Sequence, residues 1–202
     1  MFVHHGIIRR GKPEDAQDFS NLIMISGELL SALYGKKADL LMQYLFKNPQ
    51  NMYSHEHTYF AEADEKIAGM LLGYTHEEDL SQQRRTRDLT ISFLKVRYLF
   101  IISKIIKVYK NMGGLLEDEY LISNIAVYPE YRKRDFGKKL VDEAKRFAKS
   151  RRKHKLVLDV MVDNKTAISF YKNVGFVIEN ARPPFWLNRK SFEYYKMSLR
   201  IQ

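Results

Sequence analysis

The stretch from Tyr120 to Ser150 constrains the fold of this chain more than any other. Residues 121–127 are mostly apolar and β-branched, as in a buried strand, and Pro129 marks the end of that strand. Apolar residues then recur along one side of a following helix: Phe136, Leu140, Val141, Ala144, Phe147 and Ala148. The stretch therefore predicts a buried strand, a tight basic loop and an amphipathic helix.

The loop between this strand and this helix is a predicted anion site. A helix start leaves four backbone N–H groups without intrahelical acceptors and carries roughly half a positive charge, so it attracts phosphate. The surrounding side chains add positive charge: Arg132, Lys133, Arg134, Lys138 and Lys139. From this stretch alone, an ordinary strand-loop-helix with a solvated basic rim is the alternative.

A second buried strand follows at residues 156–162, and after it a short helix that stops at Gly175. Side chains alternate along a strand, so its apolar members share one face: Leu156, Leu158, Val160 and Val162. Asp159 lies on the opposite face, together with Met161 and Asp163. A carboxylate is therefore predicted on the less apolar side of a buried strand.

These residues resemble the motifs of the GNAT superfamily of acetyl-CoA-dependent N-acetyltransferases. The family's loop pattern is Gln/Arg-x-x-Gly-x-Gly/Ala; Arg132 fills its first place, Gly137 its last, and Asp135 replaces its middle glycine. The family's later pattern is met in full by Asn164, Ala167, Tyr171, Gly175 and Phe176. The resemblance is strongest over residues 120–178 and covers the first half of the chain in outline.

The order of the predicted elements is that of an α/β fold with a mixed sheet. Along the chain come a strand, helices, a hairpin, a helix, and then strands alternating with helices. The hairpin joins residues 58–62 to residues 66–74, and the last strand covers residues 192–199. The resemblance implies a GNAT-like central mixed β-sheet flanked by helices. We expect residues 1–202 to form a single domain of this kind.

The apolar run at residues 89–110 is longer than the segment that the family outline has between its third and fourth strands. Its apolar residues recur at helical spacing, which predicts one long extra helix. The run is not expected to span a membrane, because cations interrupt it: Lys95, Arg97 and Lys104. A helix packed on the core, a wall over the acceptor site and the surface of a homodimer remain alternatives.

The composition favours an anionic ligand and excludes sites that depend on cysteine. The formal net charge is +10, and residues 131–155 hold twelve of the 34 Lys and Arg residues against three acids, which would steer a polyanionic cofactor to the predicted anion site. The absence of cysteine excludes disulfides, thiolate zinc sites and cysteine nucleophiles. His55 and His57 lack a third ligand at a recognisable spacing, so no metal is expected. Residues 1–10 do not read as a signal peptide, which predicts a cytoplasmic protein.

The resemblance assigns cofactor contacts to particular positions. It implies that the backbone of the loop holds the pyrophosphate of coenzyme A, through Arg132, Lys133, Arg134, Asp135, Phe136, Gly137 and Lys138. It implies that the strand end pairs with the pantetheine arm through Ile125, Ala126 and Val127, and that the thioester lies in a gap between this strand and the next. It also implies that Asn164 contacts the cofactor and that the Val127 N–H stabilises the oxyanion.

The resemblance also suggests catalytic groups. Tyr171 is the expected general acid for the leaving thiolate, with packing in the core as its alternative role. Asp159 is the candidate base, five residues before Asn164, where some members place a catalytic glutamate. Rival acids precede the central strand: Glu117, Asp118 and Glu119. A carboxylate at Asp135 would repel a pyrophosphate at a cost on the order of 1 kcal/mol, unless Arg134 or Lys138 neutralises it.

The function expected from these observations is transfer of an acetyl group from acetyl-CoA to a primary amine of a small molecule, a peptide or a protein, by direct attack. Two other functions stay open. The first is a nucleic-acid-binding module built on residues 131–155, although exposed aromatics for base stacking are not interleaved there. The second is a catalytically inactive homologue that binds acyl-CoA as a regulatory ligand.

Overall fold

The structure is a computed structural model that describes residues 7–201. Residues 1–6, part of the segment that does not read as a signal peptide, lie outside this range, as does residue 202. The strands are β1 (Ile7–Arg10), β2 (Thr58–Ala63), β3 (Lys66–Thr75), β4 (Glu119–Val127), β5 (Lys155–Met161), β6 (Val177–Ala181), β7 (Phe185–Leu187), β8 (Lys190–Phe192) and β9 (Tyr194–Arg200). The α-helices are α1 (Ala16–Ser26), α2 (Leu29–Tyr34), α3 (Ala38–Lys47), α4 (His76–Leu94), α5 (Ile102–Met112), α6 (Phe136–Ser150) and α7 (Lys165–Val174).

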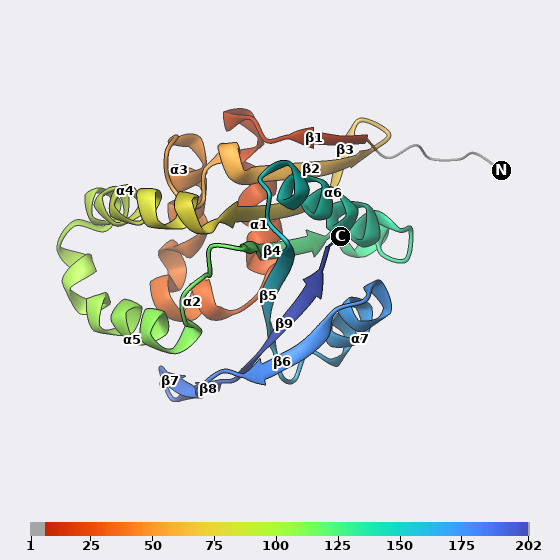
Figure 1. The fold of residues 1–202 in the computed structure, drawn as a ribbon. Coiled ribbons are helices and arrows are strands. Elements are labelled where there is room, and N and C mark those ends of the chain that lie inside the picture. The colour runs from red at the N-terminus through yellow and green to blue at the C-terminus, as the bar shows by residue number, and fades with distance from the viewer. Residues whose placement is uncertain (1–6, 202) are drawn as a thin grey trace.

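Seven strands form one mixed sheet in the order β1-β2-β3-β4-β5-β9-β6. Every neighbouring pair runs antiparallel except β4 and β5, which run parallel. Strands β7 and β8 form a separate two-stranded ribbon. In Figure 1, β1 to β4 lie in the upper half of the molecule, and β5, β9 and β6 fan away below them. The predicted α/β fold with a central mixed sheet flanked by helices is confirmed.

Helices cover both faces of the sheet, and each face has its own core. Helices α6 and α7 bury their apolar sides against one face, in a cluster that includes Leu71, Tyr120 and Phe176. Helices α1, α3 and α4 pack on the other face, around Phe60 and Met70. The central strands therefore have apolar residues on both sides, which explains their near-continuous hydrophobic runs.

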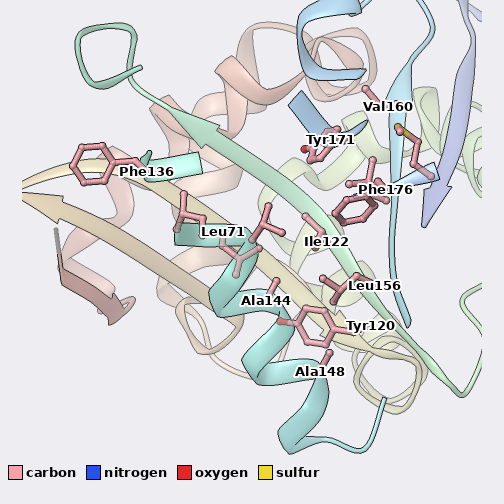
Figure 2. Packing of buried hydrophobic residues seen from close by; sticks show 14 of the residues in the cluster. Leu71, Tyr120, Ile122, Phe136, Ala144, Ala148, Leu156, Val160, Tyr171 and Phe176 are labelled. Carbon is pink, nitrogen blue, oxygen red and sulfur yellow. The ribbon is translucent and has the colours of Figure 1, made fainter. Parts of the chain in front are cut away.

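The amphipathic stripe predicted for residues 136–150 is the inner side of α6. Its apolar members are almost fully buried: Phe136, Leu140, Val141, Ala144 and Ala148. Figure 2 shows Ala144 and Ala148 on the side of α6 that faces the strands, close to Tyr120. The small alanines let the helix axis approach the sheet, while Phe136 fills the space at the start of the helix.

The single long helix predicted over residues 89–110 is wrong. The chain instead forms α4, a 3-10 helix (Lys95–Phe100) and α5. Lys95 ends α4, because its φ of 52° is incompatible with a continuing α-helix. The 3-10 turn that follows buries Tyr98 in the same core cluster as Leu94. Helix α5 returns below α4 and ends at Gly113, as the sequence predicts (Figure 1). Within residues 7–201, no helix is both long enough and apolar enough to cross a membrane.

Truncating Leu140 tests the packing of α6. Leu140 is fully buried between α6 and the sheet, so we expect Leu140→Ala to lower the free energy of unfolding by about 2–5 kcal/mol, measured by denaturant titration. Leu40→Ala on α3 is the matched control, because Leu40 is half exposed and its loss should change stability by about 0.5 kcal/mol or less. Equal losses in the two variants would contradict the assignment of Leu140 to the core.

Candidate functional site

The parallel strands β4 and β5 pair over a short length and then separate. Three residue pairs join them: Glu119–Lys155, Tyr120–Leu156 and Leu121–Val157. Two residues further along, β4 has a bulge at Ser123. Asn124 faces Leu72 of β3 and Ile122 faces Gly73, so Ser123, which lies between Ile122 and Asn124, has no partner in β3. A bulge bends its strand, so β4 turns away from β5 at this level. The two strands form a fork that opens toward their carboxyl ends.

A cluster of ion pairs fastens the closed end of the fork. Glu119 of β4 is fully buried and accepts hydrogen bonds from Lys155 of β5 at 3.1 Å and from Lys196 of β9 at 2.6 Å. Glu179 of β6 also pairs with Lys155, at 2.6 Å. One carboxylate thus ties three neighbouring strands together just before β4 and β5 part.

The open end of the fork is part of a large cleft of about 1920 Å³. One side of the cleft is lined by β4, the loop before α6, β5 and α7. The other side is lined by residues of α2, β3, α4 and α5 and of the turn between α4 and α5. The cleft therefore runs from the predicted anion site, past the separated strands, to a second compartment beyond β4.

The backbone of β4 presents unpaired polar groups to this cleft. The Tyr128 N–H donates to the Ala68 carbonyl at 2.9 Å, so at this end of β4 the even-numbered positions direct their polar groups to β3. In an antiparallel pair the direction alternates, which turns the N–H groups of Ile125 and Val127 to the β5 side. Because β5 has already separated, these groups are available to an extended ligand.

The start of α6 presents a second set of backbone N–H groups. Asp135 occupies the N-cap position, but its carboxylate makes no capping hydrogen bond. Its φ is 61°, a left-handed conformation that Asp adopts more readily than most residues and that suits a position where the family has glycine. The amides of Phe136, Gly137 and Lys138 therefore lack both intrahelical acceptors and a side-chain cap. This arrangement fits an anion such as a pyrophosphate.

Gly137 is needed where α6 approaches α7. A Cβ atom at this position would lie 3.1 Å from the Phe170 ring, which is closer than most real contacts. Phe170 in turn packs on Tyr171, with ring centroids 5.3 Å apart. A glycine at the second position of α6 thus lets the start of α6 lie directly beside the helix that carries Tyr171.

Nearly all the predicted site residues line the cleft, although they lie on five separate segments. They are Ile125, Ala126, Val127, Arg132, Lys133, Asp135, Phe136, Gly137, Lys138, Asp159, Asn164 and Tyr171. Arg134 is the exception, and its guanidinium lies 5.7 Å from the centre of the Tyr131 ring. Arg132 points back to the strand, where it donates to the Val127 carbonyl at 3.2 Å.

Asn164 and Tyr171 sit at opposite ends of α7. The side-chain oxygen of Asn164 accepts from the Ala167 amide at 3.1 Å and caps the helix, which leaves its NH₂ group to the cleft. Tyr171 is almost fully buried between α7 and the sheet (Figure 2), and burial raises the pKa of its phenol to about 12. A phenol with such a pKa keeps its proton at neutral pH and can donate it to a strongly basic group.

Asp159 has a partner that the sequence analysis did not anticipate. Its carboxylate accepts two hydrogen bonds from Arg182, at 2.8 and 3.2 Å. Burial raises the pKa of Asp159 above its ordinary value, while Arg182 opposes this rise. Of the rival acids, Glu119 is held in the ion-pair cluster, and Glu117 and Asp118 do not line the cleft. No group of three or more potential metal ligands occurs within residues 7–201.

A family model described as Acetyltransferase (GNAT) family matches residues 28–176, which is well over half of the chain. This chain belongs to the GNAT acetyltransferase family. The resemblance stated from residues 120–178 is therefore confirmed, and the enzyme class implied is an acyltransferase.

Similar solved structures support the fold of this GNAT acetyltransferase over nearly the whole chain. An N-acetyltransferase from Staphylococcus aureus Mu50 is 22% identical with a TM-score of 0.70, covering 96% of this chain and 100% of that one. An acetyltransferase solved by crystallography is 20% identical with a TM-score of 0.69, covering 97% and 100%. A Bacillus subtilis acetyltransferase in complex with CoA is 17% identical with a TM-score of 0.57, covering 98% and 99%.

A sequence relative matches over a shorter stretch. The uncharacterized protein ML0378 of Mycobacterium leprae (strain TN) is 41% identical over 76 residues. The match covers 38% of this chain and about a fifth of that relative's length.

Several residues of the cleft were not found from the sequence. Asp79 and five tyrosines line its second compartment, and Arg182 holds Asp159. The sequence offered no signal for them, because they come from segments far apart in the chain and share no motif. Residues 76–88 are highly polar, which is compatible with an exposed loop or a helix start, and in the structure they form the first two-thirds of α4.

The ion-pair cluster makes the stability of this protein depend on pH. Burial raises the pKa of Glu119, but hydrogen bonds from Lys196, the Leu116 amide and Lys155 outweigh it, so the pKa lies below its ordinary 4.5. A depressed pKa in the folded state stabilises the protein above pH 4.5, and this contribution is lost as the pH falls through the folded-state pKa.

We expect Glu119→Gln to lower the free energy of unfolding by about 2–3 kcal/mol at pH 7, and the difference from the unmodified protein to shrink below pH 4.5. Urea titrations at pH 7, 5, 4 and 3 measure both effects. Glu14→Gln, which removes an exposed acid, is the control and should change stability little at any pH. A constant difference between Glu119→Gln and the unmodified protein across this range would contradict the role given to the carboxylate.

Proposed function

We propose that this protein is an N-acetyltransferase that transfers the acetyl group of acetyl-CoA to a primary amine by direct attack, acting as one catalytic domain. The observation that carries the proposal is the fork between β4 and β5, which exposes strand amides next to an uncapped helix start inside one cleft. A thioester ligand with a pyrophosphate at one end and an amide-rich arm fits these two sets of N–H groups.

The donor would be held mainly by backbone groups. The amides of Phe136, Gly137 and Lys138 would bind the pyrophosphate, with the charges of Arg132, Lys133 and Lys138 around it. The N–H and C=O of Ile125 would pair with the pantetheine arm as an added strand, and the NH₂ group of Asn164 would donate to it from the other side of the fork. The Asp135 carboxylate would repel the pyrophosphate, and the cations around the loop would offset this repulsion.

Acyl transfer to an amine forms a C–N bond and breaks the C–S bond of the thioester. Negative charge develops on the carbonyl oxygen during the attack, and the Val127 N–H is the donor we assign to it. The departing thiolate needs a proton, which the Tyr171 phenol would supply. Most of the remaining rate enhancement would come from holding the two reactants side by side in the cleft.

The amine must lose a proton to attack and again as the product forms. We assign the first of these protons to Asp159, whose pKa is raised by burial and which therefore is a better base than an exposed aspartate. The second would replace the proton that Tyr171 gives to the thiolate. Because Arg182 occupies both carboxylate oxygens, the proton would reach Asp159 through a water molecule.

Gly137→Glu tests the anion site. The new carboxylate would lie at the open amides of α6 and crowd Phe170, so we expect uptake of acetyl-CoA to fall by at least about 100-fold in calorimetry. Lys138→Glu keeps the glycine and should also weaken uptake, which separates charge from crowding. Lys149→Glu, at the exposed far end of the same helix, is the control and should bind normally.

The outcome of that titration also decides between the functions left open by the sequence. Unchanged affinity in Gly137→Glu and Lys138→Glu would remove the phosphate assignment. Salt-dependent binding of RNA without uptake of acetyl-CoA would favour a nucleic-acid module on residues 131–155. Uptake without release of free thiol, over a panel of amines, would favour an inactive acyl-CoA-binding protein.

Tyr171→Phe tests the general acid. Removing the phenol oxygen should lower kcat roughly 100-fold with little change in the affinity for acetyl-CoA, because the ring still packs on Phe176. Free thiol release measures the rate, and calorimetry measures the affinity. Tyr195→Phe, on a partly buried tyrosine outside the cleft, is the control. A normal rate for Tyr171→Phe would leave Tyr171 with a packing role alone.

A further inference from the structure

Five tyrosines converge on the compartment of the cleft that lies beyond β4. Tyr34 ends α2, Tyr53 follows α3, Tyr74 lies near the end of β3, Tyr98 lies in the turn after α4, and Tyr109 lies on α5. Five separate segments thus each bring one phenol to the same space. The cleft is continuous from these tyrosines to the carboxyl-terminal half of β4, where the donor would present its acyl group.

Three of these tyrosines are largely buried, but their hydroxyl oxygens keep some exposure. Within residues 7–201, the hydroxyls of Tyr34, Tyr53 and Tyr98 form no hydrogen bond with another side chain or with the backbone. Every fully buried side-chain oxygen in this range does have a hydrogen-bond partner. These oxygens are therefore not sealed in the core, and the cleft is the space that their residues line. The compartment has ring surfaces as its walls and phenol oxygens as hydrogen-bond acceptors.

Asp79 adds a negative charge to this compartment. It is half-buried on α4, and the Gln83 side chain donates to it at 2.9 Å. Among the described residues it forms no ion pair, in contrast to Asp159 and Glu119, whose charges are matched by Arg182 and by lysines. Burial raises the pKa of Asp79, and burial together with the charge of Asp79 raises the pKa of Tyr74 and of Tyr109. A cation bound here would relieve this unmatched charge.

Three cations of α4 and α5 also line the cleft on this side: Arg84, Arg87 and Lys110. Arg84 and Arg87 both pair with Asp88 on the exposed side of α4. Among the described residues no lysine or arginine forms an ion pair with the half-buried Asp79 carboxylate, and His76 is the basic side chain whose charge acts on it.

We propose that this compartment binds the acceptor, and that the acceptor is a small primary amine with an apolar or aromatic body, which enters as an ammonium ion on Asp79 and the phenol oxygens. An ammonium group carries only donors, so it matches a wall that offers carboxylate and phenol oxygens. The rings bury the apolar body and attract the cation. This inference rests on the proposed function and names the substrate class of that same cleft.

The first test changes Asp79. With 2-phenylethylamine as the test acceptor, we expect Asp79→Asn to raise KM roughly 10- to 100-fold, since a hydrogen bond to a charged group is lost, while the affinity for acetyl-CoA stays the same. Asp142→Asn on α6, which removes an exposed carboxylate outside the cleft, is the control and should leave both values unchanged. An unchanged KM in Asp79→Asn would overturn the role of this carboxylate.

The second test removes single phenol oxygens. Tyr53→Phe keeps the ring and loses one acceptor, so KM for 2-phenylethylamine should rise roughly 2- to 10-fold. Tyr44→Phe is the matched control, because Tyr44 packs on Phe93 in the same core but does not line the cleft. Equal kinetics for the two variants would overturn the assignment of the phenol oxygens.

Ligand selection separates this inference from the proposed function. Calorimetry with and without coenzyme A should detect 2-phenylethylamine but not 3-phenylpropionate, which has a similar body and the opposite charge. If acetyl-CoA binds and thiol is released with spermidine or a peptide while 2-phenylethylamine is neither bound nor acetylated, the substrate class is wrong and the enzyme function stands. If acetyl-CoA is not bound at all, the proposed function fails, and with it the identification of the amine as an acceptor.

Discussion

The separation of β4 from β5 is the constraint on which the rest of this structure depends. A sheet satisfies its backbone polar groups by pairing strands side by side, so separating two central neighbours leaves N–H and C=O groups without partners. Here the pairing stops at Leu121 and Val157, and the bulge at Ser123 keeps the strands apart beyond that point. The opposite end must be held firmly for such a fork to persist. The buried carboxylate of Glu119, bonded to lysines of the next two strands, provides that hold.

The fork is suited to binding a ligand because α6 begins beside it. The chain leaves β4, turns through Lys133 and Asp135 with left-handed φ values, and enters the helix with its first amides uncapped. Gly137 then lets this helix start lie against Phe170 and so against the helix that carries Tyr171. Under the proposed function, the donor would thus be recognised by backbone groups more than by side chains. Asp135 adopts the left-handed φ that the loop needs at this point, so the residue fits the backbone of the turn.

The sequence predicts those parts of the structure that are local. The strand, loop and helix over residues 120–150 and the strand and helix over residues 156–174 each carry their own pattern, so their order and the residues lining the donor side follow from the sequence. The break at Lys95 does not, because an apolar run at helical spacing is compatible with one helix or with two that fold back on each other. The pairing of Asp159 with Arg182 also depends on a long-range contact, between β5 and the segment after β6, that no local pattern encodes.

The two ends of the cleft differ in charge, and this difference bears on how the reactants would be sorted. The excess of Lys and Arg in this basic chain is concentrated in residues 131–155, around the helix start, so a polyanion is attracted to that end and an ammonium ion is repelled from it. At the other end the Asp79 carboxylate lies among tyrosines without a lysine or arginine partner in the described residues, and in the proposed arrangement it would hold an ammonium ion. In that arrangement each reactant would be disfavoured at the binding place of the other. The two would meet at the carboxyl-terminal half of β4, where the exposed amides of the fork lie.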